Sequence, residues 1–125
     1  MKQVLILGAG LSATYLIEYF EANADANNWH LTIADREVDA VRKKISREQT
    51  EAISLDSTNS EQLKATIYGK SLVISLLPAQ FHYKVAQLCV ELGVHFASAS
   101  YLSKEIKELN KKAKKQNLIL LNECG

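Results

Sequence analysis

A glycine-containing segment near the start of the chain has the residue types and the spacing to bind a dinucleotide. It reads GAGLSA at residues 8–13 and fits the pattern G-x-G-x-x-G/A. Gly8 permits a tight turn, Gly10 lets a diphosphate approach the backbone, and Ala13 lets a helix pack closely against a strand. The first amides of that helix direct partial positive charge toward the phosphates. The segment therefore predicts cofactor contacts from Gly8, Gly10, Leu11, Ser12 and Ala13, and the alternative is a glycine turn without a ligand.

Two charged residues after the second apolar run bear on the choice between NAD and NADP. Asp35 stands 25 positions after Gly10, where an acid accepts hydrogen bonds from the adenosine ribose and repels a 2′-phosphate. That residue favours NAD. Arg36 follows directly and could bind a 2′-phosphate, which favours NADP, or could be a solvated residue at the start of a helix. The sequence predicts an NAD(P) cofactor and leaves NAD against NADP open.

Two further segments follow later apolar runs, at the edge where ligands bind in sheets of this kind. Asp56 could accept a hydrogen bond from the adenine amine, or could be a turn or capping residue before residues 57–59. Leu76, Leu77 and Pro78 are expected to contact the nicotinamide half of the cofactor through backbone and apolar groups. Alternatively, Pro78 only starts the next helix, where its missing amide costs nothing.

Hydroxyl groups cluster after the fifth apolar run. Ser98 is a candidate for contact with the cofactor ribose or the substrate, and the alternative role for this run is helix capping by Ser100 or Ser103. Tyr101 is the residue that we expect on the substrate side of the site. His82 opens a helix near the same edge, where it is either functional or packed.

These residues are positioned by short apolar runs that alternate with amphipathic stretches. Continuous apolar runs are typical of strands buried on both faces, and helical spacing marks the segments between them. Strands that alternate with helices form a parallel sheet covered on both faces, and right-handed crossovers favour the strand order 3-2-1-4-5-6. The predicted fold is a doubly wound, Rossmann-type α/β domain with a six-stranded parallel sheet and helices on both faces. The predicted strands are residues 4–7, 30–34, 53–55, 72–77, 94–97 and 118–121.

Local signals set the ends of several elements. Residues 23–28 are small and polar and are expected to form a loop after the first helix. Asn59 with Gln62 resembles a capping box, and Gly69 and Gly93 are placed to end helices in the left-handed conformation. Lysines fill the last turns of the final helix within residues 111–115, where cations suit the helix dipole.

Composition and charge exclude several classes of protein. The 125 residues are 47% hydrophobic and 23% charged, which is typical of one soluble globular domain. The formal net charge of +1 argues against nucleic acid as the main partner. The apolar runs are too short for a signal peptide or a membrane helix, so no membrane association is expected. The two cysteines, Cys89 and Cys124, form no CxxC pair, so we expect no metal site and a cytoplasmic location.

Five segments taken together resemble the saccharopine dehydrogenase family. They are VLILGAGLSA at residues 4–13, AISLDSTNSEQL at 52–63, SLVISLLPAQFH at 71–82, ASASYLS at 97–103 and LILLNECG at 118–125. The likeness covers essentially the whole chain. The SLLP-x-x-FH and N-E-x-G motifs are far more specific than the glycine turn.

The resemblance implies an NAD(P)-dependent oxidoreductase of lysine metabolism. Such enzymes join an amino acid, typically glutamate, to aminoadipate semialdehyde as an imine, and hydride from NAD(P)H reduces that imine to saccharopine. The reaction can also run in reverse. In the family, the tyrosine that matches Tyr101 lies near the substrate. The aspartate credited with acid-base or orienting work follows in an L-D-P-G segment after N-E-x-G, and a second domain binds the substrate carboxylates.

The resemblance also implies how far the domain extends. Residues 1–125 are expected to form the N-terminal NAD(P)-binding domain of a longer enzyme, since the chain stops at Gly125 before the L-D-P-G segment. The amino-acid substrate would then bind through the missing domain, the isolated chain would be inactive, and the parent enzyme could be a homodimer. The glutamate-forming, NADP-using branch often has a basic or small polar residue at Asp35 and a hydroxyl residue at Ala99, and Arg36 could compensate for the first difference.

Two other functions are alternatives. The first is reduction of a different imine, as in carboxynorspermidine dehydrogenase of polyamine synthesis, because the missing domain sets the substrate. The second is a nucleotide-sensing regulatory domain like those that gate potassium uptake. Those domains share the glycine turn, the acid after the second strand and this length, but residues 75–82 do not fit them well.

Overall fold

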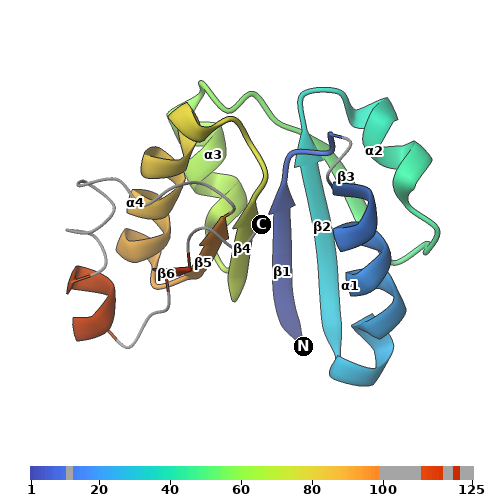
Figure 1. Ribbon diagram of the computed structural model, residues 1–125, viewed down its shortest axis with the longest axis horizontal. Helices are drawn as coiled ribbons and strands as arrows, with labels where there is room; N and C mark the ends of the chain where they lie inside the picture. The colour runs from blue at the N-terminus through green and yellow to red at the C-terminus, as the bar shows by residue number, and fades with distance from the viewer. Residues whose placement is uncertain (11–12, 99–110, 117–119, 122–125) are drawn as a thin grey trace.

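The computed structural model describes residues 1–10, 13–98, 111–116 and 120–121. These residues form one parallel sheet in the order β3-β2-β1-β4-β5-β6, with helices on both sides (Figure 1). This is the predicted Rossmann-type α/β fold, with the predicted strand order. The strands are β1 (Lys2–Leu7), β2 (Trp29–Asp35), β3 (Glu51–Ser54), β4 (Leu72–Ser75), β5 (His95–Ser98) and β6 (Leu120–Leu121). The helices are α1 (Ala13–Asn27), α2 (Val38–Lys44), α3 (Ser60–Ile67) and α4 (His82–Leu92), with the short 3-10 helix η1 (Ala79–Phe81) before α4.

The central strand β1 shows why its sequence is continuously apolar. Leu5 and Leu7 belong to the core formed with α3 and α4, whereas Val4 and Ile6 belong to the core formed with α1 and α2. All four side chains are buried. A strand covered on both faces has no polar side, which is the pattern that the sequence predicted for this run.

The carboxyl ends of the strands form the edge that matters for function. β1 lies between β2 and β4, where the chain crosses from one half of the sheet to the other. In open parallel sheets, ligands bind in the crevice at such a switch point, outside the carboxyl ends of the strands. This edge is the upper one in Figure 1, where β1 leads into α1.

The first helix is longer than predicted. The loop predicted at residues 23–28 is wrong, because α1 continues to Asn27. Ala24 is buried and extends the inward stripe of the helix by one turn. The side-chain amides of Asn23 and Asn27 each donate to a carbonyl oxygen four residues earlier, at 2.8 Å. These asparagines bond along the helix instead of ending it, and the chain leaves the helix at Asn28 with a φ of 55°.

The strands differ from their predicted bounds by one or two residues, and the reasons are clearest for β4 and β3. β4 ends at Ser75 rather than Leu77, although the amide of Leu76 still donates to the carbonyl oxygen of Leu7 at 2.7 Å. β3 begins at Glu51, before the apolar residues that marked it in the sequence. Hydrogen bonding to the neighbouring strand sets these bounds, and apolar pattern alone does not report it.

The predicted helix ends are largely confirmed. The Asn59 side chain accepts from the amide of Gln62 at 3.1 Å, which is one half of a capping box. The Gln62 side chain instead accepts from the amide of Asp56 at 3.2 Å, so the reciprocal half of the box is wrong. Gly69 and Gly93 adopt the predicted left-handed conformation, with φ of 80° and 71°.

A buried glutamate joins α1 to the segment between α2 and β3. Glu21 is 6% exposed. Its carboxylate accepts hydrogen bonds from the amides of Ser46 (3.1 Å) and Arg47 (2.9 Å) and from the hydroxyl of Thr50 (2.9 Å). A buried carboxylate is tolerated when donors of this kind surround it. This anchor holds α2 next to α1, beside the glycine turn.

The described part of the final helix follows the prediction. Residues 111–115 are helical, with Ala113 buried and the four lysines of this segment exposed. The predicted cap at Ser103 lies outside the described residues. No helix in the described ranges is long and apolar enough to cross a membrane. Within those ranges, no group of three or more His, Cys, Asp or Glu side chains is placed to hold a metal ion.

Candidate cofactor-binding site

The two glycines of the turn after β1 have different surroundings. Gly8 has a φ of 97°, and a Cβ there would lie 3.1 Å from the carbonyl carbon and oxygen of Leu76. Both the backbone conformation and the close approach of the next strand therefore require glycine at this position. Gly10 is exposed, and a Cβ there would meet no atom of the described residues within 4 Å. The space beside Gly10 is open to a ligand, which fits the predicted approach of a diphosphate.

The helix that follows the turn packs as the fingerprint predicts. Ala13 is fully buried in the core that α1 and α2 form with the sheet, and its amide donates to the carbonyl oxygen of Gly10 at 3.0 Å. A small residue here lets α1 begin close to β1. Leu11 and Ser12, which are also predicted to contact the cofactor, lie outside the described residues.

Asp35 is bonded to the turn itself. One carboxylate oxygen accepts from the amide of Ala9 at 2.6 Å, and the other accepts from the amide of Glu37 at 2.9 Å. The sequence suggested contact with ribose hydroxyls and gave no sign of these backbone bonds. Each carboxylate oxygen has a second lone pair, so the same group can still accept from a ribose. Asp35 thus fixes the end of β2 to the glycine turn.

Arg36 and Asp56 lie at the ends of neighbouring strands. Asp56 accepts from the hydroxyl of Thr58 at 2.6 Å and from its amide at 3.0 Å, so it has the contacts of a turn residue. These two hydrogen bonds, and to a smaller extent the positive charge of Arg36, lower the pKa of the Asp56 carboxyl. Arg36 is exposed, and its charge is therefore available at the adenosine side of the edge.

The predicted nicotinamide segment leaves the sheet at the switch point. Leu76 packs toward the α1 and α2 core, and Leu77 packs toward the α3 and α4 core. Pro78 is exposed and stands at the start of η1, as the alternative for this residue required. The backbone of Leu76 directly faces Gly8, so the two loops meet where a dinucleotide would cross the sheet.

Buried polar side chains lie beneath this segment. Ser98 is 2% exposed and pairs in register with Ser75, which is fully buried. His82 is 5% exposed, and its burial lowers the pKa of the imidazole, although the backbone of Leu77 partly opposes the change. In the described part of the chain, neither the Ser75 hydroxyl nor the His82 ring reaches a partner with hydrogen-bond geometry. The packed alternative for His82 matches this burial. From the sequence, Ser75 was identified only as the first residue of the segment at the switch point, without a contact of its own.

Lys44 is a further residue that sequence reasoning missed. Its ammonium donates to the carbonyl oxygen of Gly10 at 2.9 Å and to the hydroxyl of Thr14 at 2.8 Å. The neighbouring Arg42 and Lys43 are exposed, and the sequence holds no signal that separates Lys44 from them. Only the fold brings the end of α2 against the start of α1.

The described part of this edge therefore combines an open glycine turn, a carboxylate tied to that turn, two cations and a buried polar layer. These groups can bind and orient a dinucleotide. Tyr101, the residue predicted for the substrate side, lies outside the described residues.

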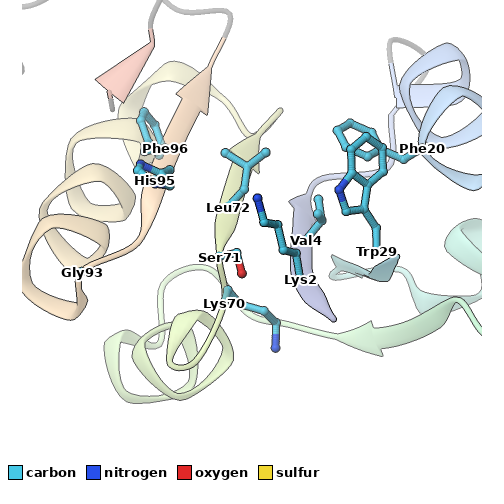
Figure 2. A pocket seen from close by; sticks show the side chains of 10 residues that line it. All are labelled: Lys2, Val4, Phe20, Trp29, Lys70, Ser71, Leu72, Gly93, His95 and Phe96. Atoms are coloured by element: carbon cyan, nitrogen blue, oxygen red, sulfur yellow. The ribbon is translucent and has the colours of Figure 1, made fainter. Parts of the chain in front are cut away.

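A pocket of about 700 Å³ opens at the opposite edge, where the strands begin. Figure 2 shows Phe20 and Trp29 on one side of it and His95 and Phe96 on the other, with Lys2 between them. None of its lining residues is a predicted cofactor residue. The pocket is therefore separate from the candidate site.

Comparisons with known proteins point to one family. Residues 4–121 match the family model described as saccharopine dehydrogenase NADP binding domain. The chain is 32% identical over 124 residues to saccharopine dehydrogenase [NADP(+), L-glutamate-forming] of Saccharomyces cerevisiae, and the match covers 99% of this chain and 27% of that protein. It is 30% identical to mitochondrial alpha-aminoadipic semialdehyde synthase of Mus musculus, over 99% of this chain and 13% of that protein.

Solved structures agree with this match. Apo saccharopine dehydrogenase (L-Glu forming) from Saccharomyces cerevisiae superimposes with a TM-score of 0.87 at 30% identity, over 100% of this chain and 27% of that one. A Rossmann-fold NAD(P)-binding family protein from Shigella flexneri gives a TM-score of 0.67 at 22% identity, over 98% of this chain and 66% of that one, and supports the fold alone. The chain spans about a quarter of the length of the yeast enzyme (27%).

Proposed function

This chain belongs to the family of saccharopine dehydrogenase NADP-binding domains, and from that premise we propose that it holds NADP(H) for hydride transfer in lysine metabolism. The observation that carries the proposal is the turn at Gly8 and Gly10. Gly8 is closed in by the backbone of the next strand, whereas Gly10 leaves open space at the switch point of the sheet. A turn shaped in this way admits a diphosphate to the backbone.

Three groups of residues would divide the work of binding. The diphosphate would lie against the turn, the adenosine half beside the ends of β2 and β3, and the nicotinamide half beside the ends of β4 and β5. The contacts that we assign are Gly8, Gly10, Leu11, Ser12 and Ala13 in the first group, Asp35, Arg36 and Asp56 in the second, and Leu76, Leu77, Pro78 and Ser98 in the third. When bound, NADP(H) supplies or accepts the hydride, and these residues hold and orient it.

The substrate is proposed from the relatives. The yeast relative is named as a glutamate-forming saccharopine dehydrogenase. The corresponding reaction would deliver hydride to the carbon of the imine formed by glutamate and aminoadipate semialdehyde, with a proton added to its nitrogen, to give saccharopine. In the opposite direction, saccharopine would be oxidised to the imine, which water would cleave to the two products. We place Tyr101 on the substrate side of this reaction.

The family match favours this reaction over the two alternatives raised by the sequence. We propose that residues 1–125 act as the cofactor-binding domain, and that a separate part of the enzyme binds the amino-acid substrate. A turnover assay with saccharopine and NADP+ tests this division of labour. The 125-residue chain should show no turnover, and robust activity from it would contradict the proposal.

We propose a homodimeric enzyme and a cytoplasmic location. Cys89 is a free, buried thiol whose burial raises its pKa to about 12, so this cysteine is inert and needs no disulfide. Sedimentation of the purified enzyme and fractionation of cells test the two proposals. A monomer, or recovery of the enzyme in an organelle, would count against them.

Titration with NADPH and NADH, followed by calorimetry, tests cofactor binding directly. The chain is expected to bind dinucleotide and to bind NADPH more tightly than NADH. Adenosine 2′,5′-bisphosphate should compete with NADPH, since it carries the adenosine half of the ligand. A folded chain that binds neither dinucleotide would refute the proposed function.

A further inference from the structure

Resting on the proposed function, we propose that Lys44 is a specificity residue that binds the 2′-phosphate of NADP(H). Lys44 ends α2, and its side chain reaches the glycine turn, where the ammonium contacts Gly10 and Thr14. Both contacts are to neutral oxygens, so the charge of the lysine is not balanced by them. Among the described residues, Lys44 forms no ion pair with a carboxylate.

The ammonium keeps capacity for a ligand. A lysine has three N–H donors, and the contacts with Gly10 and Thr14 use two of them. Lys44 is half-buried, so an anion beside it would interact through less water than at an exposed lysine. A cation beside the first turn of α1 also opposes the dipole of that helix, and an anion between them would relieve this cost.

The position of α2 indicates that Lys44 would contact the 2′-phosphate and not the nicotinamide end of the cofactor. α2 begins at Val38, two residues after Arg36, which with Asp35 marks the adenosine side of the edge, and its residues pack against β2 and α1. The nicotinamide side lies toward β4 and β5, across β1. A cation that arrives from α2 therefore reaches the edge on the side of the adenosine ribose.

The negative charge of Asp35 disfavours a 2′-phosphate but does not exclude NADP in this arrangement. Its two carboxylate oxygens each accept a backbone amide, from Ala9 and from Glu37. Hydrogen bonds from amides stabilise the negative charge of a carboxylate and draw it toward the turn. Lys44 and Arg36 then supply two positive charges on the same side of the edge, and these compensate for the acid.

The test compares Lys44→Met with Lys43→Met. Both substitutions remove one positive charge from α2, but Lys43 is exposed and forms no hydrogen bond with the described residues of the turn, so it is a matched control for the general effect of charge. Calorimetry measures the affinity of each variant for two pairs of ligands that differ only in the 2′-phosphate. The pairs are NADPH with NADH, and adenosine 2′,5′-bisphosphate with AMP. We expect Lys44→Met to weaken both 2′-phosphorylated ligands about tenfold or more, which corresponds to one lost charge-assisted hydrogen bond.

In the same variant, NADH and AMP should bind within about twofold of wild type, and Lys44→Arg should recover most of the NADPH affinity. Equal weakening of NADPH and NADH by Lys44→Met would assign the lysine to the diphosphate and overturn the inference. An unchanged ratio of NADPH to NADH affinity together with a lower melting temperature would also overturn it, because that result describes a purely structural contact. A wild-type chain that binds no dinucleotide would instead refute the proposed function, and this inference with it.

Discussion

Replacing Gly10 with valine should separate cofactor binding from folding. In the part of the chain that the structure describes, a Cβ at Gly10 meets no atom within 4 Å, and the φ of Gly10 lies outside the left-handed region that favours glycine. The new side chain would project into open space at the surface. We therefore expect the free energy of unfolding to stay within about 0.5 kcal/mol of wild type, as for most surface substitutions.

Binding should respond very differently. The valine side chain would occupy the space through which the diphosphate reaches the backbone. A hydrogen bond to a charged group contributes about 1.5–3 kcal/mol, so the loss of two of them predicts a loss of about 3–6 kcal/mol. Since about 1.4 kcal/mol corresponds to a factor of ten, NADPH affinity should fall at least about a hundredfold.

Gly8→Ala provides the contrast within the same turn. Its Cβ would lie 3.1 Å from two backbone atoms of Leu76, and the position has a φ of 97°. Such backbone strain costs about 1–3 kcal/mol, so this variant should lose stability. Urea denaturation and NADPH calorimetry on both variants measure the two effects. If Gly10→Val binds NADPH as wild type does, the diphosphate does not lie at this turn and the reasoning fails.

Three further predictions follow from single side chains. Asp35→Asn keeps an acceptor for the amide of Ala9 but removes the negative charge. Calorimetry should therefore show the affinity for NADPH rising several-fold relative to that for NADH. An unchanged ratio of the two affinities would make Asp35 purely structural. Glu21→Ala leaves buried donors unpaired and should lower the free energy of unfolding, measured by urea denaturation, by about 3 kcal/mol. The control Glu18→Ala, at an exposed position, should leave that free energy almost unchanged. Equal losses in the two variants would contradict the role of Glu21 as an anchor. Burial holds the pKa of His82 in the folded state below the usual imidazole value of about 6.5, so the unfolded chain binds more protons at this residue. The free energy of unfolding should therefore fall as the pH drops below about 6.5. His82→Gln should flatten this fall, and an identical pH profile would exclude the histidine as its cause.

The fold could be predicted from the sequence because it depends on the pattern of apolar and polar residues along the chain. Continuous apolar runs such as Val4 to Leu7 are produced by burial on both faces, and alternation of strands with helices leaves few topologies. The glycine turn was equally visible, because backbone conformation and the neighbouring strand require glycine at Gly8, while Gly10 keeps the space at the turn open. These features are local in sequence, so reading along the chain finds them.

The features that the sequence could not supply are contacts between distant residues. Lys44 and Gly10 are separated by 34 positions, and Glu21 and Thr50 by 29. Neither side chain differs in type from exposed neighbours of like charge, so its role appears only when α1 and α2 are packed together. The extension of α1 through residues 23–28 was missed for a related reason. Asparagine is typical of loops, but these asparagines bond to the helix backbone.

The position of the cofactor is tested most directly by mapping NADPH onto the backbone amides of the isotope-labelled chain by NMR. The largest shifts on titration should fall at Gly8, Gly10 and Asp35, at the carboxyl edge of the sheet. The pocket of Figure 2, with Trp29 and Lys70, provides an internal comparison at the opposite edge. Shifts confined to that pocket, or an absence of shifts at the glycine turn, would contradict the assignment of this chain as an NADP(H)-binding domain that uses the turn after β1.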